Sequence, residues 1–558
     1  AATLINNINY SLQMDISQNI DDRGNAEYKD DLFKYGYYGR MIVRDVPSFD
    51  YGYDPIANRL GYLQDAFIYT LDTVYSTGIN PLLAVYNERY YENYNPFFNQ
   101  SFMPTITDLE VGGGLTNGMS PRNYSFKSFD GDLNIAMPGV IDNTYQKTNN
   151  LQLRASGNLS LDVKGHEISA GFEYEKRTDR GYSVNPVGLW LRARSLMNDH
   201  ISQLDFNNPQ PQFVQVNGQY ITDPYGNYIF NDTVLYPRLY SAQSQYLFDI
   251  NFRLAHGIDV DSREWVNIDG YDPSDLSISY FSPDELFLNG NSLIDYFGFD
   301  HSGNKTTGRI TFNDFFTKTY TVAAGNTRFS RQIAPFEPIY MAGYIQDKFA
   351  FNDLVFNIGL RVDYLDLNQK VLKDEYLFFE THTVDENFDI NTYPWMYDQN
   401  GRLAVPNNIP SGASIYVNSA NDPTRILGFR SERTWYNADG VVVSNPESNS
   451  DIYPFLVAGD IVGSQSFLNS FTDYKPEITP MPRIAFSFPV SDEALFYAHY
   501  DILTKRPSQG RISYQDYLFI KGASSSQIIS NPNTRPEKTV AYELGFQQKV
   551  SETSSINI

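Results

Sequence analysis

The feature that most constrains this chain is the alternation of apolar and polar side chains over segments of about ten residues. Residues 151–163 show it most clearly: leucine, alanine, glycine and valine occupy the odd positions, and polar side chains occupy the even ones. The same alternation occurs in 8–16, 354–364 and 540–546. Successive side chains of a strand point to opposite faces, so each segment predicts a strand with one apolar and one polar face. These strands exceed the average globular length of about five or six residues.

The length and composition of these strands favour a membrane-spanning sheet. A transmembrane β-strand needs about 9–11 residues, with one face toward lipid and the other toward water or a plug. The chain contains 43 tyrosines and 38 phenylalanines, and aromatic residues gather where such strands cross the membrane surface. No stretch of the sequence reaches the roughly 18 consecutive apolar residues of a membrane-spanning helix. A soluble β-sandwich with one hydrated face is the alternative that the alternation leaves open.

Short and long connections alternate along the chain, and this order separates the two alternatives. The short links, which predict hairpin turns, lie at 164–165, 352–353 and 491–493. The long connections, far beyond the usual few residues, are expected at 46–148, 179–338, 369–480 and 505–538. Outer-membrane barrels combine short periplasmic turns with long extracellular loops, whereas a soluble sandwich has no reason to do so. The sequence therefore predicts an antiparallel transmembrane β-barrel whose long connections are extracellular.

The expected fold is all-β: residues 1–558 form part of a barrel, with about ten strands and no plug. The strands are expected at 5–18, 33–45, 149–163, 166–178, 340–351, 354–368, 483–490, 494–504 and 539–550, with a further strand beginning at Ser554. The first short link, 19–32, is longer than the others. Residues 246–254 also alternate, but a strand there would put a long loop on the short-turn side, so we expect a helix or a loop.

The C-terminal third carries a recognisable motif. Residues 531–545 read Asn-Pro-Asn-Thr-Arg-Pro-Glu-Lys-Thr-Val-Ala-Tyr-Glu-Leu-Gly. This segment is similar to the barrel segment Asn-Pro-(Asn/Asp)-x-x-Pro-Glu-x-x-x-x-(Tyr/Trp)-Glu-x-Gly of TonB-dependent outer-membrane receptors. Further segments resemble other parts of these receptors: 357–364, 482–488 and 495–500 look like successive strands, and 172–175 and 339–348 look like the long-looped type that often works with a surface lipoprotein.

The resemblance implies a receptor in the outer membrane of a Gram-negative bacterium. Such a protein imports a scarce nutrient (a sugar, a peptide or a chelate), powered through a periplasmic energy-coupling protein of the TonB type. The alternative is a structural or adhesive barrel whose loops bind a partner protein. No plug-like domain or energy-coupling box precedes the first expected strand, and the chain does not close on a terminal aromatic residue. We therefore expect an interior section of a longer receptor.

The sequence provides no signal for an enzyme or for a resident cofactor. It contains no cysteine, and its histidines stand alone, without the spacing that holds a metal from one element; they are His166, His200, His256, His301, His382 and His499. The glycine-rich segment 112–118 fails the dinucleotide fingerprint and is expected to be a flexible loop. The net charge of −24 argues against nucleic acid as a partner. No catalytic, cofactor-binding or metal-binding residue is therefore expected.

Two further segments are candidates for binding, each with a simpler structural explanation. Residues 257–300 contain ten acidic residues and one basic residue, Arg263, which gives either oxygen ligands for calcium or a solvated loop. Trp190, Tyr182 and residues 89–102 offer aromatic rings for sugars or peptides, although aromatic residues also pack long loops together. The substrate-binding residues remain unassigned from the sequence.

Overall fold

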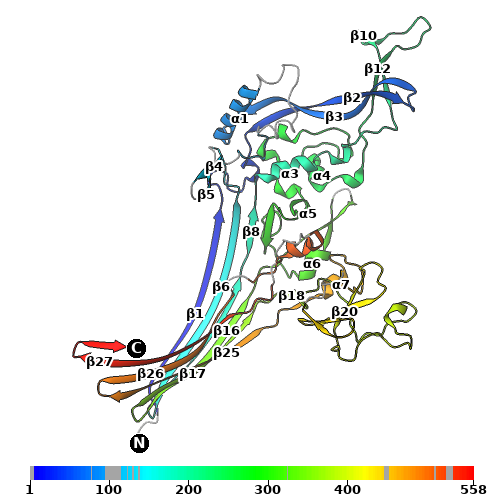
Figure 1. Cartoon of the computed structure of the whole chain (residues 1–558). Coiled ribbons are helices and arrows are strands. Elements are labelled where there is room, and N and C mark those ends of the chain that lie inside the picture. The colour runs from blue at the N-terminus through cyan, green and yellow to red at the C-terminus, as the bar shows by residue number, and fades with distance from the viewer. Residues whose placement is uncertain are drawn as a thin grey trace.

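The chain forms a long, curved antiparallel sheet with a thick layer of loops at one end (Figure 1). The computed structural model describes residues 5–76, 78–94, 115–121, 124–128, 131–135, 139–322, 325–444, 451–507, 510–522, 529 and 532–558. Among the described residues the sheet has eleven strands, of which the short β8 (Gly181–Val184) and β13 (Ile294–Phe297) extend it beside the start of β6. The other nine, here called the wall, are β1 (Ile5–Arg23), β6 (Tyr145–Val163), β7 (His166–Thr178), β16 (Ile339–Phe351), β17 (Leu354–Asp366), β25 (Glu477–Ser491), β26 (Ala494–Lys505), β27 (Glu537–Ser551) and β28 (Ser554–Asn557). The expected all-β, antiparallel partial barrel with long loops is confirmed, with nine such strands for the expected ten.

Strand order in the wall follows the chain, apart from one long excursion. Every strand pairs antiparallel with the next wall strand in the sequence, and β1 pairs directly with β6. Short turns close one end, next to the N-terminus in Figure 1. At one of them, Lys164 and Gly165 have φ angles of 49° and 88°. Two consecutive residues with positive φ are what a two-residue type I′ hairpin turn requires.

The expected wall strand at 33–45 is wrong. Residues 39–54 form β2 (Gly39–Asp54), which pairs with β3 (Arg59–Ser76) in a separate sheet with β12 (Phe230–Leu235) and β9 (Gln210–Phe213). Just before β2, the side chains of Phe33, Tyr35 and Tyr37 are buried in the loop layer. Their apolar character reflects a protein core and not a lipid-facing surface. The expected short link 19–32 is consequently wrong as well, and the first long connection runs over 24–144, not 46–148.

The loop layer between β1 and β16 has a core rich in aromatic side chains. At its centre, Trp190 of α3 (Gly188–Leu196) donates a 2.8 Å hydrogen bond from Nε1 to the carbonyl of Phe33 and stacks on Tyr37 with ring centroids 5.3 Å apart. Residues 246–254 form a helix, as expected, in α4 (Leu247–Ala255), which buries Phe248 and Phe252. Aromatic burial of this kind supplies much of the packing energy of a loop layer that lacks a large sheet of its own.

The elements of this layer are short. They are η1 (Leu32–Lys34), α1 (Pro81–Tyr94), β4 (Tyr124–Ser128), β5 (Gly131–Ile135), β8 (Gly181–Val184), η2 (Asp199–Ile201), β10 (Gln215–Val216), β11 (Gln219–Tyr220), η3 (Ala242–Ser244), η4 (Ile268–Gly270), η5 (Pro273–Asp275), η6 (Ile278–Tyr280), α5 (Pro283–Leu286), β13 (Ile294–Phe297), α6 (Phe312–Thr317), β14 (Thr319–Thr321) and β15 (Thr327–Phe329). Within the residues described, no helix is both long and apolar enough to cross a membrane.

Residues 367–476, between β17 and β25, form a second lobe with its own core. The lobe contains β18 (Lys370–Leu372), η8 (Pro394–Met396), β19 (Ser414–Val417), β20 (Ile426–Ser431), β21 (Thr434–Asn437), β22 (Val442–Val443), β23 (Tyr453–Pro454), α7 (Gln465–Asn469) and β24 (Phe471–Asp473). The guanidinium of Arg430 is fully buried there and pairs with Asp374. The last connection carries α8 (Tyr514–Leu518) and η9 (Ile520–Gly522).

Candidate functional site

The two faces of the wall differ sharply in polarity. Cross-strand pairing puts Tyr10, Leu159, Ala170, Ile345 and Leu360 in one row across five strands, on one face. Exposed apolar side chains cover this face on all nine strands, among them Leu12, Met14, Ile16, Leu153, Phe172, Tyr174, Met341, Ile358, Ile478, Ile484, Tyr500, Val540, Tyr542, Leu544 and Ile556. Monomeric soluble proteins rarely expose an apolar surface this continuous. We call it the outer face.

A band of phenylalanines crosses the outer face near the short turns. The ring centroids of Phe349 and Phe356 lie 5.3 Å apart, those of Phe356 and Phe486 6.3 Å, and those of Phe486 and Phe496 6.2 Å. Phe546 lies opposite Phe496 on the next strand. Membrane barrels carry such aromatic girdles where the lipid tails end and the polar headgroups begin. Such a band is what a membrane boundary close to the short turns requires.

The opposite, inner face carries paired charges. Arg154 lies 2.7 Å from Glu173, and Arg361 lies 3.6 Å from the same carboxylate and 2.7 Å from Asp363. Farther along the sheet, Arg483 pairs with Asp501 at 2.8 Å. Ion pairs and polar side chains of this density suit a hydrated lumen, because an unpaired charge facing lipid would be costly.

The mouth of the wall, at its loop end, is bridged by residues of the last connection. Arg506 forms a 3.0 Å ion pair with Glu175 and lies over the ring of Tyr340, 4.2 Å from its centroid. Gln369 donates through Nε2 to the carbonyls of Gly510 and Pro532 and accepts through Oε1 from the amide of Ile512 at 2.9 Å. These contacts fix the last connection across the top of the inner face.

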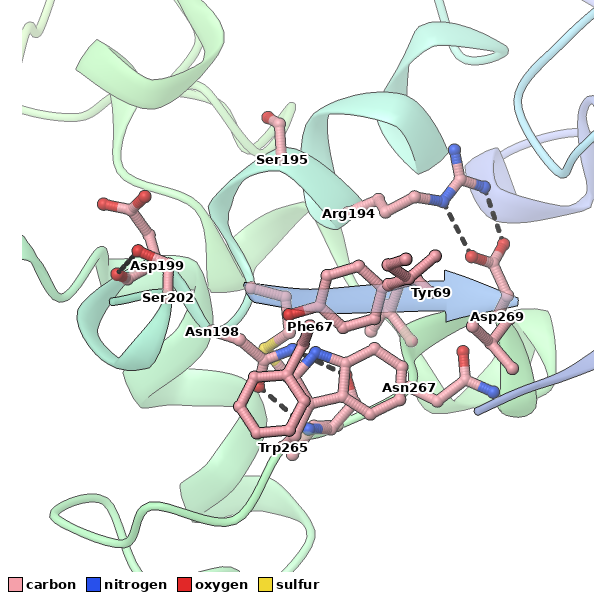
Figure 2. Close-up of a pocket in the computed structure, with 15 residues that line it drawn as sticks. Phe67, Tyr69, Arg194, Ser195, Asn198, Asp199, Ser202, Trp265, Asn267 and Asp269 are labelled. Atoms are coloured by element: carbon pink, nitrogen blue, oxygen red, sulfur yellow. Dashed lines mark hydrogen bonds and ion pairs between the residues drawn. The ribbon is translucent and has the colours of Figure 1, made fainter. Parts of the chain in front are cut away.

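The loop layer contains an open cavity of about 530 Å³ between β3, the end of α3, η2 and residues 265–269. Figure 2 shows the rings of Phe67, Tyr69 and Trp265 side by side within it. Tyr69 and Trp265 are nearly parallel, with an interplanar angle of 19° and centroids 5.0 Å apart. The volume falls within the range of about 300–1,000 Å³ typical of small-molecule sites. We call this space the aromatic cavity.

Two polar groups flank the rings, on opposite sides in Figure 2. On one side, Arg194 binds Asp269 through two hydrogen bonds of 2.7 Å and also donates to the carbonyl of Asn117 at 2.9 Å. On the other side lie Asp199, the first residue of η2, and Ser202, which directly follows η2. Among the described residues, no basic side chain forms an ion pair with Asp199. Arg194 is therefore paired within the protein, whereas the carboxylate of Asp199 has no ion-pair partner among the described residues.

A buried network holds η2 against the cavity wall. Asn198, with φ of 64°, accepts through Oδ1 from the amide of Val266 at 2.8 Å and donates through Nδ2 to the carbonyl of Val266 at 2.7 Å. The adjacent His200 is buried, 3.6 Å from the carboxylate of Asp249. Burial lowers the pKa of His200, although the Asp249 carboxylate acts in the opposite direction. The rim residues of η2 are thus fixed before any ligand arrives.

Of the residues that the sequence suggested for binding, Trp190 and Tyr182 lie in one buried core. Trp190 and Tyr182 are buried in the loop core, and their rings do not line the aromatic cavity. Residues 89–94 end α1, while 95–102 lie outside the described residues. Of the expected flexible glycine loop, 112–114 likewise lie outside them and 115–118 are buried.

The histidines are scattered through the fold. His166 lies on the outer face, His499 on the inner face, His200 and His301 in the loop core, His256 beside Phe252, and His382 in the second lobe. Within the described residues, which include all of 257–300, no group of three or more histidine, aspartate or glutamate side chains converges to hold a metal ion. Several acids of this stretch instead pair with arginines: Asp269 with Arg194, Asp284 with Arg331, and Asp295 with Arg511.

Sequence reasoning missed the aromatic cavity. Its rings come from β3 and from the acidic stretch 257–300, and no local motif links the two. The one available signal was Trp265, a single tryptophan within ten acidic residues. Large aromatic side chains in a polar loop mark either packing or binding. The stacking of Trp265 on Tyr69 shows that here a ring pair lines a cavity.

Comparison with known proteins gives only distant structural similarities. No protein-family model matches the chain, and no curated protein matches its sequence. The ferric-catecholate import receptor Fiu of E. coli K12 shares 11% identity over 73% of this chain and 30% of its own, with a TM-score of 0.23. The copper transporter OprC shares 8% identity over 73% of this chain and 28% of its own, with a TM-score of 0.22.

The hemophore receptor HasR of Serratia marcescens, in complex with its hemophore HasA and heme, shares 10% identity over 91% of this chain and 51% of its own, with a TM-score of 0.20. This chain thus spans about half or less of each of these proteins. Similarities of this size establish neither the family nor the function of the chain.

Proposed function

We propose that this chain is part of an outer-membrane receptor that imports a nutrient by energy-coupled uptake, and that it is not an enzyme. The observation that carries the proposal is the division of the wall into an apolar outer face and a charged inner face, maintained over nine strands. A soluble sheet would need a second protein layer to cover the outer face. Lipid covers it without one, and the phenylalanine band near the turns suits the membrane boundary.

The loop layer supports a receptor role over a purely structural one. Only the long connections fold into ordered lobes with their own cores, and they do so at one end of the wall (Figure 1). A rigid scaffold that carries elaborate loops is the usual arrangement for binding. On this proposal the loop end faces outward from a Gram-negative cell and the short turns face the periplasm.

Energy coupling and a surface lipoprotein partner rest on the sequence resemblance. Within the described part of the motif, the carbonyl of Pro532 accepts a 3.1 Å hydrogen bond from Gln369, and the motif continues into β27. The motif thus joins the mouth of the wall to a membrane strand, which is consistent with a barrel segment of a transporter. The imported nutrient is proposed only as a class: a sugar, a peptide or a chelate.

The test compares which solutes cells remove from a complex medium. Three strains of the source bacterium would be grown in it: the parent, one lacking this protein and one lacking the periplasmic energy-coupling protein. Mass spectrometry of the spent medium should find a common set of solutes left unconsumed by both mutants. Normal depletion by the strain lacking this protein, together with loss of a surface-bound partner protein, would support the adhesive alternative instead.

A further inference from the structure

We propose that the aromatic cavity captures an organic cation, an ammonium or guanidinium group on an apolar stem such as the basic side chain of a peptide. The inference deepens the proposed function and rests on it in one respect: the loop layer has to face the outside. It concerns the residues Phe67, Tyr69, Trp265 and Asp199, which line one continuous cavity.

The rings provide the first part of the case. Three aromatic side chains lie together in Figure 2, and two of them are stacked at 5.0 Å. The faces of aromatic rings are electron-rich and attract a cation within about 6 Å of the ring centre, tryptophan most strongly. Arg238 already uses this attraction within the protein, since its guanidinium lies 3.9 Å from the centroid of Phe67. Trp265 has no such cation of its own among the described residues.

The distribution of charge provides the second part. Arg194 is engaged by Asp269, and Arg238 is engaged by Asp45 at 2.9 Å. Of the other charged side chains, Asp199 lines the cavity. Three acids, Asp259, Asp261 and Glu264, and one basic residue, Arg263, precede Trp265 in the chain without lining the cavity. None of these four acids forms an ion pair within the described part of the chain. An incoming cation would find the Asp199 carboxylate without an ion-pair partner, whereas Arg194 and Arg238 are already paired and not available to an anion.

The same charges discriminate between ligand classes. An anionic ligand would be repelled both locally and by the net charge of −24, which also speeds the approach of cations at low salt. A neutral ring could stack on the aromatic side chains but would leave the Asp199 carboxylate without an ionic partner. A cation on an apolar stem uses both features, because the stem packs on the rings while the charged end reaches the carboxylate.

The experiment labels the full chain, folded in detergent, with 5-fluorotryptophan. The four tryptophans give four ¹⁹F resonances, and substitution of Trp265 by phenylalanine assigns the one at the cavity. The probes are the peptide Gly-Arg-Gly, the same peptide with uncharged citrulline in place of arginine, spermidine and maltose. The Trp265 resonance should shift with Gly-Arg-Gly or with spermidine, and the buried Trp190 resonance should not. Which cation binds more tightly distinguishes a peptide source from a polyamine source.

Variants test the two contacts separately. Tyr69→Ala, which removes one of the two stacked rings and keeps the Trp265 reporter, should weaken binding of the cationic probe about tenfold, and Asp199→Asn should weaken it about three- to tenfold, mainly at low salt. The matched control is Asp439→Asn, an exposed carboxylate in the second lobe, which should bind as the parent does. Retention of the ¹⁹F pattern of the other tryptophans shows that each variant is folded.

Three results would overturn the inference. They are equal binding of the arginine and citrulline peptides, a shift of the Trp265 resonance by maltose and not by either cation, and the absence of any shift at millimolar probe. None of these bears on membrane insertion, because the measurement is made in detergent. Failure of the capture site is therefore distinguishable from failure of the receptor proposal.

Discussion

Replacing Ile345 with arginine should destabilise the wall far more than the same replacement one residue later. Ile345 lies on the outer face, 56% exposed, between Ala170 and Leu360 on the neighbouring strands. Gln346 follows it in β16 and points to the inner face, opposite Ser169 and Gly359. The two positions share a strand and a membrane depth, so only the face differs.

The magnitude follows from what each face contacts. An arginine on the lipid face costs about 2–4 kcal/mol near the bilayer midplane and about 0–1 kcal/mol near its boundary. At Gln346 the new guanidinium enters a polar surface and replaces a side chain that is already polar, so the expected cost stays under about 1 kcal/mol. Phe351, at the turn end of the same strand, provides the boundary control: Phe351→Arg should cost less than Ile345→Arg.

The assay is reversible folding into lipid vesicles. Urea titrations, followed by the mobility shift that folded barrels show in unheated gels, give the change in unfolding free energy for each variant. Equal costs at Ile345 and Gln346, or a greater cost at Gln346, would mean that the faces are assigned the wrong way round.

Three further predictions concern the loops. Trp190→Ala should destabilise the loop layer by about 3–5 kcal/mol, because it empties a buried site and removes the bond to Phe33, and should appear as faster proteolysis of 179–338 with the wall intact. Burial lowers the pKa of His200, so below a pH of about 6.5 the imidazole is protonated in the unfolded loop layer but stays neutral in the folded one. The free energy of unfolding of the loop layer should therefore fall below that pH. His200→Gln should make this free energy, measured by hydrogen exchange, less dependent on pH. Arg506→Ala should speed amide exchange of 510–522 by releasing Glu175, while Lys521→Ala, at an exposed pair, should not.

The wall was predictable from sequence because its physics is local. Alternation with period two records the two faces of a strand directly, and the short turns record the hairpins. The same signal misled at 33–45, since Tyr35 and Tyr37 bury their rings in a loop core. A one-dimensional pattern distinguishes buried from hydrated positions, but it does not distinguish lipid from protein as the apolar neighbour.

The aromatic cavity was not predictable, for a different reason. Tyr69, Asp199 and Trp265 come from three separate segments, and each is ordinary in its own local sequence. Their meeting depends on the pairing of β2 with β3 and on the buried hydrogen bonds of Asn198. Such long-range contacts leave no periodic trace, so the cavity emerges only once the loop layer is assembled.

The central claim is that the loop end of a membrane-spanning wall faces outward, and cysteine labelling of intact cells tests it most directly. The chain has no cysteine of its own, so single cysteines report without background. Ser274 is exposed in the loop layer, and Asp353 is exposed in the turn after β16. Within that turn, Asp353 is the better labelling position, because Asn352 has a φ of 54°, which disfavours a cysteine. A membrane-impermeant maleimide should label Ser274→Cys in intact cells and Asp353→Cys only after the outer membrane is opened. Labelling of Asp353→Cys but not of Ser274→Cys in intact cells would contradict the topology and the uptake function proposed from it.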